Sequence, residues 1–179
     1  MSFPIPTLKG QRVILREVIP EDRVSYLAHA GEREAAWGFG GEMKDVGPKA
    51  PEQADRWLKG RPGWMRWVIT VDGRHIGTVS LHDLVESDRR ATLAIGIMSA
   101  GDMNQGFGTE AMKLVLAHGF GEMKLHRIDL RVLARNKRAI RAYEKCGFVH
   151  EGVQRQVAFI DGRWEDDLMM SVLEHEFEP

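Results

Sequence analysis

The sequence predicts a mixed α/β domain in which a mostly antiparallel central sheet of about seven strands carries helices on both faces. The prediction rests on several short strand-like runs, two Asp-Gly pairs between such runs, and one strand–helix–strand passage. The pairs Asp72-Gly73 and Asp161-Gly162 are typical of antiparallel hairpins, because both turn residues need positive φ. The passage over residues 91–133 requires a right-handed crossover between parallel strands. Together, the two kinds of pairing make the sheet mixed.

The N-terminal part is expected to alternate between extended and helical segments. A first strand is predicted over residues 12–18. Pro20 and the two acids after it start a helix to about Glu34, because proline and acidic side chains suit the first helical turn. Clustered Gly and Pro residues predict a loop over 37–51, and a short helix is expected over 51–59.

The remaining strands are expected over residues 66–71, 76–84, 91–98, 127–133, 148–157 and 164–173. The strand over 91–98 is nearly continuously apolar, which indicates a central position in the sheet. A helix is predicted over 106–123, where apolar side chains recur at helical spacing. This stripe consists of Met112, Val115, Leu116, Phe120 and Met123. A second helix is expected over 136–146.

Size and composition limit the classes of function. The 179 residues predict one domain over positions 1–179. The 25 Lys and Arg against 26 Asp and Glu give a formal net charge of −1, which argues against a general nucleic-acid binder. Cys146 is the one cysteine, so an intrachain disulfide and Cys-rich metal sites are excluded. No signal peptide or membrane-spanning run is recognised, and a cytoplasmic location is expected.

A glycine loop, Gly106-Phe107-Gly108-Thr109, lies between the expected fourth strand and the long helix. Glycines allow close approach to a ligand, and a helix N-terminus offers unpaired N–H groups and a positive dipole. Such a segment can bind a diphosphate, or it can be a turn that merely starts a helix. With Ala111 the loop also fits a dinucleotide fingerprint. That fold places the fingerprint after the first strand of a βαβ run, whereas antiparallel hairpins precede it here.

A second segment runs from Asn136 to Phe148 and reads N-K-R-A-I-R-A-Y-E-K-C-G-F. Together the two segments resemble the GNAT family of N-acetyltransferases. The closing stretch is similar to the branch that includes the ribosomal-protein N-terminal acetyltransferases. The resemblance implies a sheet splayed between its fourth and fifth strands. It also implies direct transfer of an acetyl group from acetyl-CoA to a primary amine, on a small molecule or a protein N-terminus, without a metal, by a monomer or homodimer.

The resemblance assigns coenzyme binding to Ile97, Met98, Gly106, Phe107, Gly108, Thr109, Asn136, Arg138 and Tyr143. The loop amides would bind the diphosphate, and the backbone of Ile97 and Met98 would pair with the pantetheine arm. Arg135, Lys137 and Arg138 would meet the nucleotide phosphates, although exposed basic residues on a helix are usually solvated.

Two groups are expected to take part in the chemistry. An oxyanion needs a preorganised N–H, for which the Met98 amide is the candidate. The leaving thiolate needs a proton, which the Tyr143 phenol can supply. Tyr143 also fits a core aromatic, and Cys146 is expected to be packing. Two positions depart from the family pattern, because Met103 replaces its Gln or Arg and Ala94 replaces a common carboxylate.

The acceptor is not identified by the sequence. Candidate acceptor-site residues are Trp37 and Phe39 in the glycine-rich loop and His82, Asp83 and Glu86 after the expected third strand. The acids Glu165, Asp166 and Asp167 form a further candidate group. A coenzyme A-binding module without turnover is the alternative from a different functional class, and a nicotinamide-dinucleotide-binding protein is another.

Overall fold

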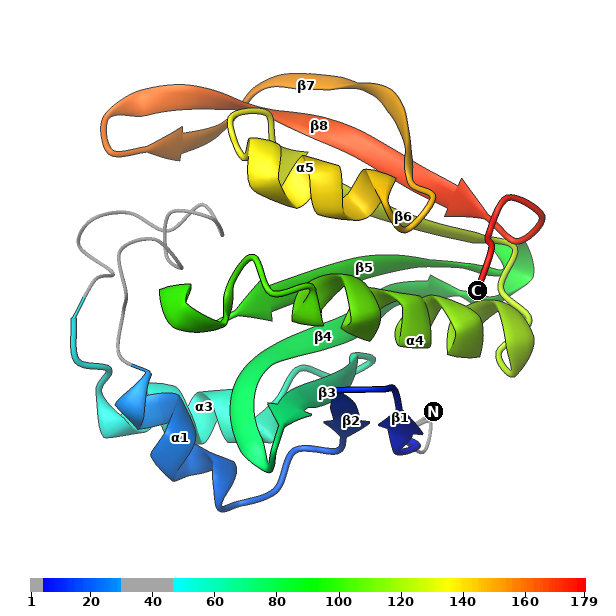
Figure 1. Ribbon diagram of the computed structural model, residues 1–179. Helices are drawn as coiled ribbons and strands as arrows, with labels where there is room; N and C mark the ends of the chain where they lie inside the picture. The colour runs from blue at the N-terminus through cyan, green and yellow to red at the C-terminus, as the bar shows by residue number, and fades with distance from the viewer. Residues whose placement is uncertain (1–4, 30–46) are drawn as a thin grey trace.

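The computed structural model describes residues 5–29 and 47–179. Within these ranges the strands form one eight-stranded sheet in the order β1-β2-β3-β4-β5-β6-β8-β7 (Figure 1). The strands are β1 (Leu8–Lys9), β2 (Ile14–Arg16), β3 (Met65–Val71), β4 (Arg74–Val85), β5 (Arg90–Ile97), β6 (Arg127–Leu133), β7 (Val149–Ile160) and β8 (Arg163–Leu173). The helices are α1 (Asp22–Ala28), α3 (Pro51–Lys59), α4 (Phe107–Gly121) and α5 (Lys137–Glu144), with short 3-10 turns η2 (Glu86–Asp88) and η3 (Ala100–Asp102).

The predicted fold class is confirmed. In the described chain β5 and β6 are the parallel pair, and the other neighbouring strands pair antiparallel. Both Asp-Gly turns have positive φ at both residues, as the hairpin prediction requires. Most bounds differ from expectation by a few residues, and two differences are larger. The two-residue strand β1 adds an eighth strand, so the expected fourth strand is β5, and α1 ends at Ala28 instead of near Glu34.

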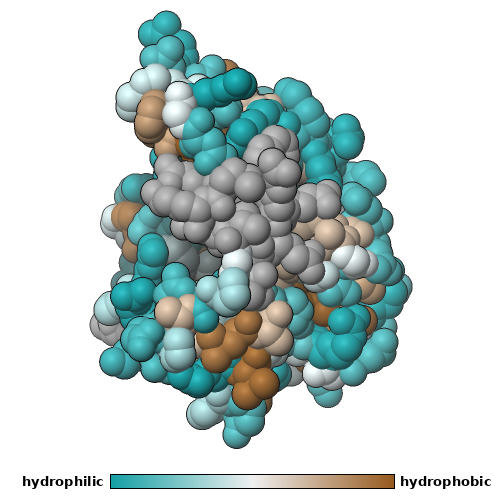
Figure 2. All heavy atoms as spheres, turned by 90° about the vertical axis from the view of Figure 1, so that its left-hand side faces the viewer, coloured by the Kyte–Doolittle hydropathy of each residue, from teal (hydrophilic) through white to brown (hydrophobic). Residues whose placement is uncertain are grey.

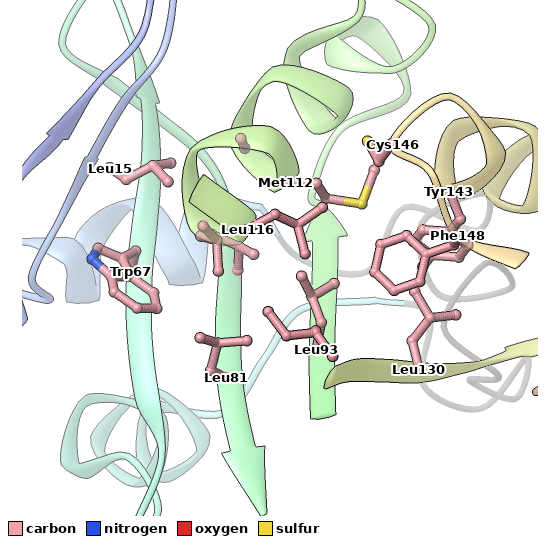
Figure 3. Close-up of a cluster of buried hydrophobic side chains, with 14 of the residues drawn as sticks. Leu15, Trp67, Leu81, Leu93, Met112, Leu116, Leu130, Tyr143, Cys146 and Phe148 are labelled. Atoms are coloured by element: carbon pink, nitrogen blue, oxygen red, sulfur yellow. The ribbon is translucent and has the colours of Figure 1, made fainter. Parts of the chain in front are cut away.

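The main core lies between the sheet and helices α4 and α5, which lie in front of the sheet in Figure 1. Met112 and Leu116 of the predicted stripe are buried there, beside Leu81 and Leu93 from neighbouring strands (Figure 3). Cys146 is also in this cluster, which confirms that it packs. Burial raises the pKa of its thiol to about 11, so the sulfur stays neutral.

Helices α1 and α3 pack on the opposite face of the sheet. Trp57 of α3 stacks between Tyr26 of α1 and His75 of β4, with ring centroids 4.7 and 5.6 Å apart. Ser25 Oγ lies 2.7 Å from His75 Nδ1. Burial lowers the pKa of His75 to about 4, so this imidazole is a neutral structural group.

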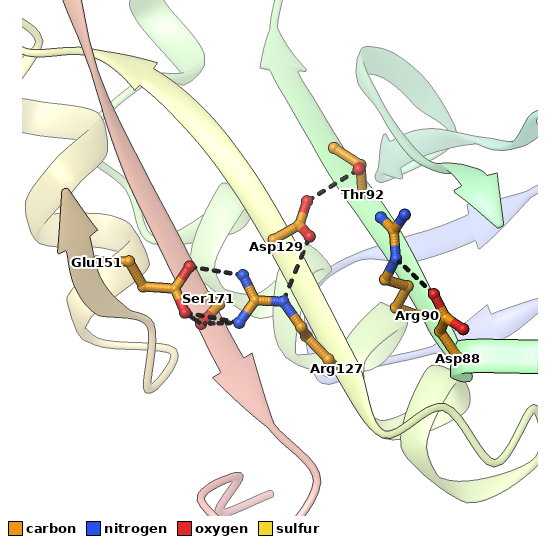
Figure 4. Close-up of polar contacts among 7 residues, drawn as sticks. All are labelled: Asp88, Arg90, Thr92, Arg127, Asp129, Glu151 and Ser171. Atoms are coloured by element: carbon orange, nitrogen blue, oxygen red, sulfur yellow. Dashed lines mark hydrogen bonds and ion pairs between the residues drawn. The ribbon is translucent and has the colours of Figure 1, made fainter. Parts of the chain in front are cut away.

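The splay between β5 and β6 is confirmed by the register of the two strands. They pair at three positions, Arg90–Thr92 with Arg127–Asp129, and β5 then continues to Ile97 without β6 beside it. At the last paired position Thr92 Oγ1 donates to Asp129 Oδ1 at 2.9 Å. Figure 4 shows that this bond belongs to a network of strand side chains, in which Arg127 binds both oxygens of Glu151. The network holds the closed end of the split.

At the open end, β4 and β5 approach each other unusually closely. A Cβ placed on Gly77 of β4 would overlap the carbonyl oxygen of Gly96 in β5. Glycine is therefore needed at position 77 for the backbone of β5 to keep its path beside the split.

No helix in the described ranges is long and apolar enough to span a bilayer.

Candidate active site

A cavity of about 600 Å³ fills the split between β5 and β6. Its walls come from β5, the first turn of α4, β6, α5 and the β7–β8 hairpin. The coenzyme-site candidates that line it are Ile97, Gly106, Phe107, Gly108, Thr109, Asn136, Arg138 and Tyr143. The structure therefore brings together residues that lie up to 46 positions apart in the sequence, because β6 and α5 return to the end of β5.

Three backbone amides at the start of α4 carry the anion-binding potential of the cavity. Gly106 precedes the helix with a φ of 84°, and the first helical bond runs from Glu110 N to Gly106 O at 3.0 Å. In the described chain the N–H groups of Phe107, Gly108 and Thr109 have no recorded protein acceptor. The helix dipole adds partial positive charge at the same place, so this turn fits a diphosphate.

Gly106 and Gly108 of the loop have different structural roles. Gly106 makes the bend, because its positive φ disfavours other residues. Gly108 lies inside α4 and has no positive φ, so it does not form the bend. A Cβ on Gly108 would lie 3.8 Å from side-chain atoms of Ile95 and Ile97. A larger side chain at this position would grow into the space between α4 and β5.

Arg12, which the sequence did not single out, holds the loop from outside. Its Nη1 donates to the carbonyl of Gln105 at 2.9 Å, and its guanidinium lies 5.0 Å from the Phe107 ring centroid. Glu110 accepts from the backbone N–H groups of Arg12 and Val13 at 2.8 and 3.2 Å. These bonds lower the pKa of the Glu110 carboxyl and tie the start of β2 to the first turn of α4.

The backbone of β5 corrects the expected oxyanion donor. Met98 N donates to Ile76 O of β4 at 2.9 Å, so this amide is committed to the sheet and Met98 does not line the cavity. Hydrogen bonding alternates along an antiparallel strand, so Ile95 and Ile97 direct their N–H and C=O groups to the other side, towards the split. The Ile97 amide replaces the Met98 amide as the candidate donor.

Tyr143 of α5 lines the cavity with a largely buried ring. The side chain is 8% exposed, and its ring packs edge-on against Phe148 with centroids 5.9 Å apart. No hydrogen bond of its hydroxyl is recorded within the described ranges, so a core aromatic with a bonded hydroxyl is not what is observed. Burial raises the pKa of Tyr143 to about 12, so the phenol keeps its proton at neutral pH.

Helix α5 and its N-cap residue contribute both structure and charge. Asn136 Oδ1 accepts from Ala139 N at 3.1 Å, so the side-chain oxygen caps the helix. Arg138, Arg141 and Lys145 line the cavity. Their spacing of three and four residues places them on one helix face, a signal that would have identified the last two in the sequence. Arg135 instead pairs with Glu165 at 3.2 Å, and neither Arg135 nor Lys137 lines the cavity.

The acceptor-site candidates differ in where the structure places them. His82 lines the cavity, stacks on Trp64 at a centroid distance of 4.1 Å, and has Nδ1 3.0 Å from Asp83 Oδ2. Asp83 does not line the cavity, and its link to the site is this contact with His82. Glu86 lies exposed in η2 and lines neither cavity, and its acceptor-site role stays a prediction. Trp37 and Phe39 lie outside the described residues.

The three acids of the C-terminal segment, Glu165, Asp166 and Asp167, differ in what they contact. Asp166 Oδ1 accepts from Gln156 N at 2.7 Å, and Glu165 binds Arg135. Asp167 lines the cavity, and burial raises the pKa of its carboxyl. Of the three, Asp167 is the one placed to meet a ligand.

A second cavity of about 420 Å³ lies on the face covered by α3. It shares Ala94, Ile95 and Gly96 of β5 with the first cavity, so β5 forms a wall common to both. The end of β5 and the start of α4 lie at the left of Figure 1. Figure 2 shows the molecule from this side, where the described surface is hydrophilic over much of its area and has a group of hydrophobic residues below the centre. Within the described ranges no three His, Cys, Asp or Glu side chains could hold a metal ion.

The geometry can support transfer between two ligands. One, long and anionic at one end, would lie along the split, with its phosphates at α4 and its reactive end beside Ile97 and Tyr143. The other would reach the same point from the opposite side of β5.

Comparison with known proteins agrees with this arrangement. The family model described as acetyltransferase (GNAT) domain matches residues 12–149, more than half of the chain. The probable N-acetyltransferase YjcK of Bacillus subtilis is 37% identical over 102 residues, 57% of this chain and 56% of that protein. The spermidine N(1)-acetyltransferase of Escherichia coli K12 is 33% identical over 112 residues, 63% of this chain and 60% of that protein. The matched stretch thus spans less than two-thirds of these relatives.

A solved structure of a spermidine N-acetyltransferase from Vibrio cholerae, in complex with CoA and spermine, superposes with a TM-score of 0.79. It is 24% identical and covers 93% of this chain and 98% of that chain, so it supports the fold alone. The fold, the split sheet, the two sequence segments and the family match agree, and the chain belongs to the GNAT family of acetyltransferases.

Proposed function

We propose that this protein transfers an acetyl group from acetyl-CoA directly to a primary amine, with both substrates bound at once. The observation that carries the proposal is the cavity in the split, where three amides without protein acceptors and the Tyr143 phenol face the same space. The names of the curated relatives, which include N-acetyltransferases acting on spermidine, support the same reaction class.

Coenzyme binding uses backbone groups first and basic side chains second. The amides of Phe107, Gly108 and Thr109 bind the diphosphate, and the backbone of Ile95 and the carbonyl of Ile97 pair with the amide groups of the pantetheine arm. The basic face of α5, formed by Arg138, Arg141 and Lys145, lies where the nucleotide phosphates need counter-charge. When bound, acetyl-CoA supplies the thioester that carries the acetyl group.

The amine needs a proton acceptor, because alkyl amines are protonated at neutral pH. His82 is the candidate base, and it would act through a chain of water molecules, because the register places it opposite Thr92, five residues along β5 from Ile97. A hydrogen bond from Nδ1 to Asp83 would fix the tautomer that leaves Nε2 as the acceptor. The Ile97 N–H stabilises the oxyanion that forms on attack. Tyr143 then donates its proton to the departing sulfur.

Two alternatives receive less support. A nicotinamide dinucleotide fits poorly, because the sheet before the glycine loop is antiparallel rather than a run of βαβ units. A coenzyme-binding module without turnover does not explain why the Tyr143 hydroxyl has no hydrogen-bond partner among the described residues. A single domain over 1–179, a cytoplasmic location, the absence of nucleic-acid and membrane partners, and a monomer or homodimer stay predictions.

A thiol-release assay tests the reaction class. Acetyl-CoA and a panel of primary amines are mixed with the protein, free thiol is followed by absorbance, and acetylated product is identified by mass. We expect release that depends on the amine and persists in the presence of a chelator. Failure of acetyl-CoA to bind, combined with binding of NAD, would replace the proposal with the dinucleotide alternative.

A further inference from the structure

The smaller cavity is strongly basic. Its charged lining residues in the described chain are three cations, Lys59, Arg61 and Arg66, and one acid, Glu17. Glu17 is exposed at the rim. A ligand with several positive charges would therefore meet net repulsion here, whereas an anionic group would be attracted.

Arg66 is held rigidly without a carboxylate partner. Its Nη2 donates to the Trp57 carbonyl at 2.6 Å, and its guanidinium lies 4.6 Å from the Trp57 ring centroid. Its Nε is buried without a hydrogen-bond partner, and no ion pair is recorded for it in the described chain. Burial lowers the pKa of Arg66, against smaller opposing effects of Tyr26 and Asp22.

Other partly buried arginines differ in this respect. Arg16 pairs with Asp22 at 2.7 Å, and Arg127 pairs with Glu151 at 2.5 Å. A charge removed from water is costly unless a partner offsets the lost hydration. An arginine that is fixed at a cavity wall and has no ion-pair partner among the described residues is therefore suited to an anion brought by a ligand.

The sheet register connects Arg66 with the part of β5 that forms a wall of both cavities. Arg66 of β3 pairs with Ser80 of β4, and Ser80 pairs with Ala94 of β5, so the three residues form a row across the α3 face. Two strand spacings separate the ends of the row, which is about 10 Å. Ala94 belongs to the wall shared by both cavities. The row therefore leads from the guanidinium to the split.

We infer that the preferred acceptor is a small primary amine that carries a carboxylate or phosphate group, which Arg66 binds while the amine reaches β5. The inference rests on the proposed function and makes it specific. It separates this protein from its spermidine-acetylating relatives, because the small cavity disfavours polycations.

Matched amines test the inference on the wild-type protein. β-Alanine is compared with β-alaninamide, and phosphoethanolamine with ethanolamine, so that each pair differs mainly in one anionic group; spermidine represents polycations. We expect kcat/KM for at least one anionic member to exceed that of its neutral match by about tenfold or more, consistent with one charged hydrogen bond. The preferred pair distinguishes carboxylate from phosphate. Preference for the neutral members or spermidine would overturn the inference and leave acetyl transfer standing.

The variant Arg66→Gln tests whether Arg66 is responsible for the preference for anionic amines. It should raise KM for the anionic amine by about ten- to a hundredfold and leave KM for its neutral match and the affinity for acetyl-CoA unchanged. Arg56→Gln is the matched control, because Arg56 is an exposed residue of α3 that lines neither cavity. Equal loss with both amines would assign Arg66 a purely structural role and contradict the inference. If Arg66→Gln does not fold, Arg66→Lys and the wild-type panel decide it.

Discussion

The cavities on the two sides of β5 are lined by different kinds of potential binding group. On the α4 side the binding groups are backbone amides and a helix dipole, with a few basic side chains at one end. On the α3 side they are side chains, among them Arg66 and the aromatic rings of Trp57 and Trp64. Backbone groups recognise what all members of a family share, whereas side chains can change without disturbing the sheet. This difference explains why one side carries a recognisable motif and the other does not.

The largest effect is expected at Gly108. In the variant Gly108→Val, the added side chain enters the space towards Ile95 and Ile97, so calorimetry should detect no binding of acetyl-CoA although circular dichroism shows a folded protein. Gly121→Val is the control, because a Cβ at Gly121 in the same helix meets nothing within 4 Å. Normal affinity in a folded Gly108→Val protein would place the coenzyme elsewhere.

A somewhat smaller effect is expected for Tyr143→Phe. Loss of the hydroxyl should lower kcat by about 10²–10⁴-fold, the usual range for a general acid, without changing coenzyme affinity or melting temperature. Because the pKa of Tyr143 is about 12, its deprotonation should not limit activity across the neutral range. Tyr26→Phe is the control, since the only other tyrosine lines neither cavity. A wild-type kcat, with chemistry shown to be rate-limiting, would make the hydroxyl structural.

Gly77→Ala tests the close approach of β4 and β5. The new methyl group would overlap the Gly96 carbonyl, so β5 must move and the free energy of unfolding should fall by about 1–3 kcal/mol, as in other overpacked sites. Coenzyme affinity should fall as well. Gly152→Ala in β7 is the control, because a Cβ there meets no atom within 4 Å. Unchanged stability and affinity would show that the path of β5 does not depend on Gly77.

The smallest effect concerns the closed end of the split. Hydrogen bonding to Arg127 lowers the pKa of Glu151 from 4.5 to about 2. A lowered pKa means that the stabilisation is present above the unfolded value of about 4.5 and is lost as pH falls towards 2. In urea unfolding, the stability difference between wild type and Glu151→Gln should therefore be steady near neutrality and shrink through this window. Partial exposure of Glu151 keeps the effect small, and a difference independent of pH would contradict it.

Local patterns were sufficient to predict the elements that form the proposed coenzyme side. The Asp-Gly turns, the apolar stripe of α4 and the glycine loop each depend on nearby residues, and the structure has them as expected. The errors there came from hydrogen bonding between strands. The register that commits the Met98 amide to Ile76 depends on how β4 and β5 pair, which residue types alone do not specify.

The acceptor side could not be predicted in the same way. Trp57, Trp64, Arg66 and Ser80 come from separate elements, and no fixed spacing links them. Arg66 stands out only when the structure shows that it is partly buried and has no carboxylate beside it. Glu86 lines neither cavity, because proximity in sequence to His82 does not by itself bring a side chain to the cavity wall.

A crystal structure of the protein with coenzyme A tests the central claim most directly. The account predicts diphosphate oxygens within hydrogen-bonding distance of the amides of Phe107, Gly108 and Thr109, with the pantetheine arm beside Ile95 and Ile97 and the sulfur near Tyr143. Coenzyme bound on the α3 face, or outside the split between β5 and β6, would contradict the account.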